Sequence, residues 1–144
     1  MVVLIDTNIL LDVLLARQPY CEEALRVLKL AENGEIKGWI AANSVDNIYY
    51  ISRRQLSPEQ TRKLLKDLLQ VVHVVSPAKK DLLWAIDSEM PDLEDAIQAV
   101  CAVKAGAKAI ITRNEKDYAD SPVKPVSPTA FLKMLKAKSV LPID

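Results

Sequence analysis

Short apolar runs alternate with longer amphipathic segments along this chain, and that alternation restricts the fold more than any other feature. The predicted strands cover 1–5, 38–42, 71–75 and 107–111, with a short fifth strand at 125–126. The predicted helices cover 9–15, 21–31, a segment from Asn43 or Ser44 to about Arg54, one beginning at Ser57, 78–87, 93–105 and 128–136. Strands joined by helical crossovers pair in parallel. We therefore expect an α/β fold, a three-layer α/β/α sandwich with a central, mostly parallel sheet of four to five strands.

Composition narrows the class of protein. The 144 residues are 50% hydrophobic and fit one domain over 1–144 with its own core. The 19 basic and 19 acidic residues cancel, so strong non-specific adhesion to nucleic acid is not expected. Cys21 and Cys101 form no CxxC pair, which argues against a disulfide framework or a zinc site. No signal peptide and no membrane-length apolar run is apparent, so a cytoplasmic protein without membrane contact is expected.

Polar residues gather after the predicted strands. In wound parallel sheets, ligands bind beyond the carboxyl ends of the strands. The residues found there are Asp6, Thr7 and Asn8; Asn43, Ser44, Asp46 and Asn47; and Thr112, Arg113, Asn114 and Asp117. Asp92, Glu94 and Asp95 stand at the head of the helix over 93–105, where Asp92 and Asp95, three apart, share one face.

Each of these residues also has a purely structural interpretation. Asp6 or Thr7 can cap the following helix, and Asp92 with Asp95 fits an acidic first turn. Asn114 and Asp117 are common turn residues. The functional interpretation depends on convergence, because clustered carboxylates repel one another unless a cation neutralises them. Oxygen ligands without a His/Cys set favour Mg²⁺ or Mn²⁺, which activate water for phosphodiester hydrolysis.

Three elements resemble the PIN-domain ribonuclease family of the toxin-like VapC type. They are Val-Val-Leu-Ile-Asp6-Thr7-Asn8, Asp92-Leu-Glu94-Asp95-Ala96, and Ile-Ile-Thr112-Arg113-Asn114-Glu-Lys-Asp117-Tyr118. They occur in the family's order and span nearly the whole chain. The resemblance implies Mg²⁺- or Mn²⁺-dependent cleavage of RNA, with metal on Asp6, Asp92, Asp95 and Asp117. It also implies that Thr7, Asn8, Thr112 and Asn114 orient the carboxylates or the attacking water.

The resemblance carries expectations about partners as well. Many family members are toxins whose small antitoxin inserts a segment into the acidic pocket, so an antitoxin is an expected partner beside the RNA substrate. A homodimer is the expected assembly, and Trp39 and Trp84 are assigned to either the core or a dimer surface.

One position departs from the family pattern. The family usually carries Glu near the start of the helix after the second strand, and the Ile-Tyr-Tyr match places Asn47 there. Asp46 is one residue away, about 100° around a helix, and is a candidate supplementary metal ligand. Asn114 likewise stands where many relatives have Asp.

Two other functions compete with a ribonuclease. A catalytically impaired PIN-like module that binds RNA or a protein partner is supported by the missing Glu. A phospho-acceptor receiver domain needs an acceptor Asp ending a middle strand, and His73-Val-Val-Ser76 has none. Arg113, beside the predicted pocket, is a candidate phosphate contact.

Overall fold

A five-stranded, fully parallel sheet forms the centre of the molecule in the computed structural model, which describes residues 1–140. The strands are β1 (Val2–Ile5), β2 (Lys37–Ala41), β3 (His73–Val75), β4 (Ala109–Ile111) and β5 (Pro125–Val126). Their spatial order is β3-β2-β1-β4-β5. The strand order changes direction at β1, which is the position where wound sheets open a crevice at their carboxyl ends. The predicted fold class is confirmed.

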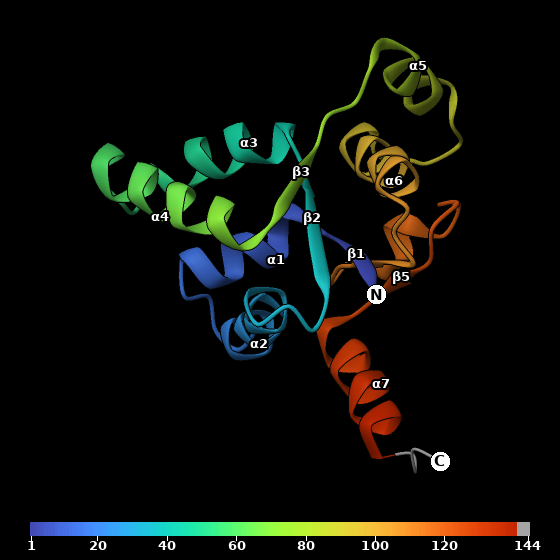
Figure 1. The fold of residues 1–144 in the computed structure, drawn as a ribbon. Coiled ribbons are helices and arrows are strands. Elements are labelled where there is room, and N and C mark those ends of the chain that lie inside the picture. Colours follow the sequence, from blue (N-terminus) through green and yellow to red (C-terminus); the bar gives the residue numbers. More distant parts are fainter. Residues whose placement is uncertain (141–144) are drawn as a thin grey trace.

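Helices cover both faces of the sheet (Figure 1). The helices are α1 (Thr7–Leu14), α2 (Cys21–Glu32), α3 (Asn43–Ser52), α4 (Pro58–Val71), α5 (Lys79–Asp87), α6 (Leu93–Ala105) and α7 (Pro128–Val140), with a 3₁₀ turn, η1 (Glu115–Tyr118). The core on one face of the sheet includes α1 to α4 and α7, and the core on the other includes α5, α6 and η1.

Strand β1 is buried on both faces, as its continuous apolar run predicts. Val3 and Ile5 belong to the core beneath α1 and α2, whereas Leu4 belongs to the core beneath α6. All three side chains are fully buried. The strand is therefore held from both sides, and the residues that follow it have a fixed starting point.

Two of the helix ends predicted from the sequence are present in the structure, and one predicted cap is not. Ser57 and Gln60 form the predicted reciprocal capping box at the start of α4. Gly106 ends α6 in the left-handed conformation, with φ 73°. The cap expected at Asn43 or Ser44 is wrong, because α3 begins at Asn43 after Ala42 and has no side-chain cap.

Two further observations bear on the sequence predictions. Cys21 and Cys101 are both free. Within residues 1–140, none of the helices combines the length and apolar character needed to cross a bilayer.

Candidate active site at the carboxyl edge of the sheet

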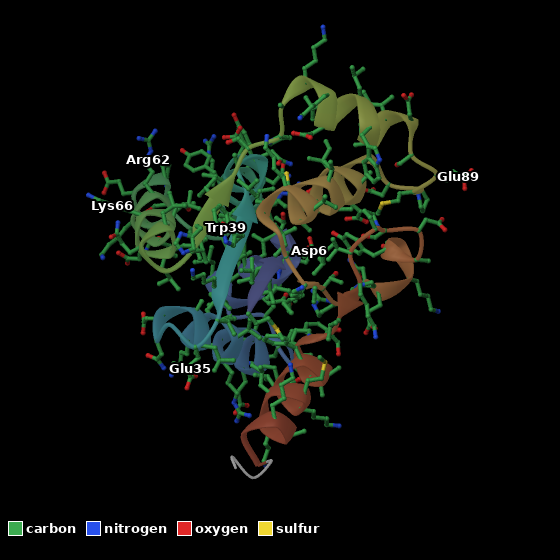
Figure 2. The ribbon with its side chains drawn as sticks, turned by 45° about the vertical axis from the view of Figure 1, so that its right-hand side comes forward. Asp6, Glu35, Trp39, Arg62, Lys66 and Glu89 are labelled. Carbon is green, nitrogen blue, oxygen red and sulfur yellow. The ribbon has the colours of Figure 1, made fainter. Side chains whose placement is uncertain are left out.

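Asp6 follows β1 at the centre of the sheet edge and is almost completely buried, with 3% of its surface exposed. Its backbone amide donates to the carbonyl of Ile111, the last residue of β4, at 3.0 Å. Thr112, the residue that directly follows β4, donates its hydroxyl to Asp6 Oδ2 at 2.8 Å. Neighbouring parallel strands thus bring together two residues that lie 106 positions apart. Figure 2 shows Asp6 near the centre of the molecule.

The Asp6 carboxylate lies in an unfavourable environment. Burial raises its pKa above the ordinary value, and the charge of Glu94 adds to the rise. The Thr112 hydroxyl and the nearby backbone amides of Thr7 and Asn8 act in the opposite direction. Asp6 occupies the N-cap position of α1 without a side-chain cap bond. Capping is therefore not a complete account of this residue.

Asp95 is the second carboxylate of this edge. Burial, together with the negative charges of Asp6, Asp92 and Asp117, raises its pKa to about 7. The Tyr118 hydroxyl donates to Asp95 Oδ1 at 3.3 Å and partly compensates. We call Asp6, Asp92, Asp95 and Asp117 the acidic cluster, because the charges of the other three act on Asp95.

The first turn of α6 explains how Asp92 reaches the cluster. Asp92 is the N-cap of α6, and its Oδ1 accepts from the Asp95 backbone amide at 2.9 Å. This is the capping interpretation that its sequence position allowed. Its second carboxylate oxygen has no hydrogen bond among the described residues, so the cap leaves an acceptor free.

A buried polar triangle lies beside Asp6. The Gln98 side-chain nitrogen donates to Thr7 Oγ1 at 3.0 Å and to Ser44 Oγ at 2.9 Å, and the two hydroxyls lie 2.8 Å apart. The triangle ties α6 to the first turns of α1 and α3. The Gln98 side-chain oxygen is buried and has no partner within residues 1–140.

Gln98 was missed by the sequence analysis. The signal was present, because Gln98 is polar among Ala96, Ile97, Ala99 and Val100 and lies three residues after Asp95. An isolated amide in an apolar helix segment indicates a buried hydrogen-bond partner.

The loop after β4 places the remaining predicted residues. The Asn114 backbone amide donates to Thr112 Oγ1 at 3.0 Å, so the same hydroxyl braces both Asp6 and the loop. Asp117 lies in η1, where its charge acts on Asp95. Asn8 lies in the first turn of α1 and is partly buried.

Asp46 and Asn47, the residues at and next to the position where the family usually has Glu, have different contacts. Asp46 is exposed, and within residues 1–140 no hydrogen bond or ion pair joins it to the acidic cluster. Asn47 instead donates its side-chain amide to Glu94 Oε1 at 2.8 Å. Glu94 lies in the first turn of α6 beside Asp95 and is exposed.

The donor chemistry of this edge fits a hard divalent cation. Its groups are carboxylate, hydroxyl and amide oxygens, the ligands that Mg²⁺ and Mn²⁺ prefer. Within residues 1–140, no three His, Cys, Asp or Glu side chains lie close enough together to hold a metal ion as they stand. Mg²⁺ commonly binds through one or two carboxylates and keeps several waters, so Asp6 and Asp95 are the residues that would hold such an ion.

Arg113 contacts Asp12 and Tyr20, although the charge of Asp6 also acts on it. Its Nε and one terminal nitrogen donate to the two oxygens of buried Asp12 at 2.7 and 3.0 Å. Its guanidinium also lies over the Tyr20 ring, 3.8 Å from the centroid. The Asp12 carboxylate raises the Arg113 pKa, and the charge is balanced locally. In this structure Arg113 is paired with Asp12, and its role as a phosphate contact stays a prediction.

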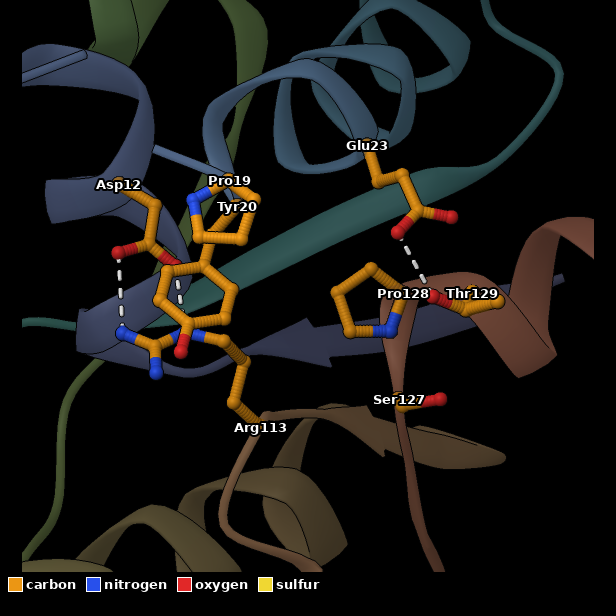
Figure 3. A pocket seen from close by; sticks show the side chains of 8 residues that line it. All are labelled: Asp12, Pro19, Tyr20, Glu23, Arg113, Ser127, Pro128 and Thr129. Atoms are coloured by element: carbon orange, nitrogen blue, oxygen red, sulfur yellow. Dashed lines mark hydrogen bonds and ion pairs between the residues drawn. The ribbon is translucent and has the colours of Figure 1, made fainter. Parts of the chain in front are cut away.

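This ion pair borders a cavity of about 390 Å³ (Figure 3). Tyr20 and Arg113 form one wall, and Ser127, Pro128 and Thr129 form the opposite wall. Thr129 donates to Glu23, which also lines the cavity, at 2.7 Å. None of the four carboxylates of the acidic cluster belongs to the lining.

Comparison with known proteins agrees with this arrangement. The family model described as "PIN domain" matches residues 2–116. A curated relative, "Ribonuclease VapC1" of Aquifex aeolicus (strain VF5), is 28% identical over 127 residues, covering 81% of this chain and 83% of that protein.

Solved structures show the same fold at lower identity. The VapBC-1 structure from nontypeable Haemophilus influenzae aligns with TM-score 0.67 and 20% identity, over 90% of this chain and 99% of that chain. VapBC2 from Rickettsia felis, bound to a DNA fragment from the promoter, has TM-score 0.67 and 16% identity, over 88% and 98%. VapC20 of Mycobacterium tuberculosis, described as a Sarcin-Ricin loop cleaving toxin, has TM-score 0.66 and 14% identity, over 82% and 94%. Because the family model spans most of the sequence, the chain belongs to the PIN-domain family.

Proposed function

We propose that this protein is a divalent-metal-dependent endoribonuclease and the toxin of a toxin–antitoxin pair. The observation that carries the proposal is the juxtaposition of Asp6 and Asp95. Each has a raised pKa, and neither forms an ion pair among the described residues. Two carboxylates held close together repel each other and destabilise the folded protein, and a cation bound between them removes this repulsion. The curated relative named a ribonuclease supports the same reaction.

Each protein group has a defined role in this proposal. Asp6 and Asp95 are the first ligands of Mg²⁺ or Mn²⁺, and Asp92 and Asp117 add negative charge and acceptors. When bound, the ion supplies an activated water and stabilises the phosphate oxygens during hydrolysis. Thr112 fixes the rotamer of Asp6 through its hydroxyl, and Asn114 holds Thr112 in turn. Thr7 and Asn8 directly follow Asp6, and their backbone amides lie close to its carboxylate.

The partners follow from the relatives. RNA is the proposed substrate, and the structures described as VapBC complexes support an antitoxin as a protein partner. The homodimer and the cytoplasmic location expected from the sequence stay predictions.

A catalytically impaired module is the second candidate. It is supported by Asn47 at the position of the expected Glu, and by the absence, within residues 1–140, of three convergent acidic or histidine side chains. Such a module would bind RNA or a protein without turnover.

One substitution tests the proposal. Asp6→Asn keeps the shape of the side chain and removes its charge, so we expect a loss of RNA cleavage of about 100-fold or more. The assay uses purified protein with RNA and Mn²⁺, with an EDTA control. Exposed Glu89, at the outer edge of the molecule in Figure 2, provides the matched Glu89→Gln control. Cleavage by Asp6→Asn at the wild-type rate would reject the ribonuclease proposal, and metal binding with no cleavage by wild type would favour the second candidate.

A further inference from the structure

Glu94 and Asn47 form a contact that only the folded chain creates. They lie 47 residues apart, on α6 and α3, and Asn47 Nδ2 donates to Glu94 Oε1 at 2.8 Å. Glu94 is exposed, and Asn47 is partly buried. The side chain of Glu94 therefore reaches back from the head of α6 toward α3 while staying accessible to solvent.

The Glu94 charge acts on the candidate active site. It raises the pKa of buried Asp6, and it also contributes to raising the pKa of Tyr118, the residue that donates to Asp95. The contact with Asn47 is the geometric observation that places Glu94 at this edge. Asn47 lies one turn after Ser44 on α3, and the Ser44 hydroxyl is 2.8 Å from that of Thr7, the residue that follows Asp6.

A second polar side chain on the same face of α6 also reaches toward α1 and α3. Gln98 lies one turn further along this helix, and its amide nitrogen reaches Thr7 and Ser44. Its side-chain oxygen is fully buried and unpartnered among the described residues. A buried acceptor without a donor is rare, and a water held by a nearby cation would satisfy it.

The hydrogen-bond partner of Glu94 is the neutral amide of Asn47, so the negative charge of Glu94 is not compensated by this contact. Other carboxylates of this chain are held by cations, as Asp81 is by Lys104 at 3.1 Å. An amide donor fixes one oxygen of Glu94 and leaves the full negative charge and the second oxygen available. Among residues 1–140, Glu94 forms no ion pair. Such a carboxylate is oriented without being neutralised, as a metal ligand must be.

We propose that Glu94 supplies the carboxylate that position 47 does not, as a ligand of the bound metal ion or of its water shell, and that Asn47 is its positioning residue. The inference rests on the proposed metal-dependent function. The family's usual Glu on the helix after the second strand is replaced here by a pair in which the charge comes from α6 and the hydrogen bond comes from α3. Asp46 then has no part in the metal site.

Mn²⁺ binding to the full-length, metal-free protein tests this pair directly. Free Mn²⁺ is followed by its electron paramagnetic resonance signal, which disappears on binding, so the readout does not depend on cleavage. Glu94→Gln keeps an acceptor for Asn47 and removes the charge, and we expect Mn²⁺ affinity to fall about tenfold or more. The double variant Asn47→Glu/Glu94→Gln moves the carboxylate to α3 and the amide to α6, and we expect it to recover most of that loss.

Three further variants make the result decisive. Asp6→Asn reports whether the signal belongs to the acidic cluster, whereas Asp46→Asn and Glu89→Gln should both bind Mn²⁺ like wild type. Thermal melts of each metal-free variant verify folding.

Wild-type affinity in Glu94→Gln, or no recovery in the double variant, would overturn the pair. If Asp6→Asn still loses Mn²⁺, the proposed metal site survives that failure. A loss in Asp46→Asn but not in Glu94→Gln would assign the supplementary carboxylate to Asp46. No Mn²⁺ binding by the wild type would overturn the pair together with the metal dependence on which it rests.

Discussion

Two buried aspartates six residues apart, Asp6 and Asp12, have opposite environments. Asp12 is fully buried and receives two charge-assisted hydrogen bonds from Arg113, with Arg17 3.8 Å away. Asp6 is 3% exposed and receives the hydroxyl of Thr112 but no ion pair among the described residues. Both carboxylates lose their hydration, but among the described residues only Asp12 forms an ion pair in return.

The difference separates a structural carboxylate from a functional one. Arg113 directly follows Thr112, so adjacent residues of one loop serve the two aspartates in different ways. A buried charge that the chain itself neutralises stabilises one arrangement of α1 and the β4 loop. A buried charge that the chain leaves without a cation makes a binding site for one. Burial alone therefore does not distinguish the two kinds of aspartate, whereas the identity of the partner does.

The largest effect on stability is expected at Asp12. Asp12→Asn removes the charge that balances Arg113, and breaking a buried pair costs about 3–5 kcal/mol. Urea unfolding of the metal-free protein measures the loss. Asp6→Asn is the matched control and should unfold like wild type or slightly later, because it removes an unbalanced buried charge. Equal destabilisation by the two variants would contradict the distinction between the two aspartates.

A smaller loss is expected at Thr112. Thr112→Val keeps the shape of this buried side chain and deletes the hydroxyl that donates to Asp6 and accepts from the Asn114 amide. Leaving such groups without partners costs about 1–3 kcal/mol. Thermal or urea unfolding of the metal-free protein measures it. Thr112→Ser retains the hydroxyl and should stay closer to wild type, and an equal loss in both variants would assign the effect to packing instead.

The smallest effect is a gradual dependence of stability on pH. The pKa of Asp95 is about 7 in the folded protein against an ordinary value of 3.8, so the folded state holds a proton that the unfolded state has released. The stability from this proton is fully present below pH 4 and is lost as the pH rises through about 7. Solvent screening limits the size, because Asp95 is only partly buried.

Comparison of wild type with Asp95→Asn isolates this dependence. Urea unfolding in EDTA between pH 4.5 and 8 should show a steeper decline in stability with rising pH for wild type. The same slope in both proteins would show that the charges of the acidic cluster do not oppose one another. A slope of opposite sign would show that Asp95 is stabilised as an anion by a cationic group.

Much of the fold was predictable from local sequence. The run Val2–Ile5 is apolar on both sides and could only be a doubly covered strand. Ser57-Pro58-Glu59-Gln60 carried its own helix start, and the structure has the capping box there. Such features depend on residues within one turn or one strand, so they do not require knowledge of distant partners.

The candidate site was predictable only in part. The rule that ligands bind at strand ends brought Asp6, Thr112 and the head of α6 together, and the structure joins them by hydrogen bonds and charge. Ser44 was misjudged as a possible helix cap because its partners, Thr7 and Gln98, lie 37 and 54 residues away. The ion pair of Arg113 was not predicted for the same reason, since its partner Asp12 is 101 residues distant.

By itself, the sequence determined which segments become strands and helices and which acids stand at their ends, because hydrophobic period and capping are short-range properties. Only the tertiary structure decided which acid is neutralised and which is not. That choice depends on whether a cation, a hydroxyl or an amide from a distant segment reaches the carboxylate, as Arg113 reaches Asp12, Thr112 reaches Asp6 and Asn47 reaches Glu94. Electrostatic and hydrogen-bond energies fall steeply with distance, and distances between segments remote in the chain are set by packing of the whole sheet and its helices.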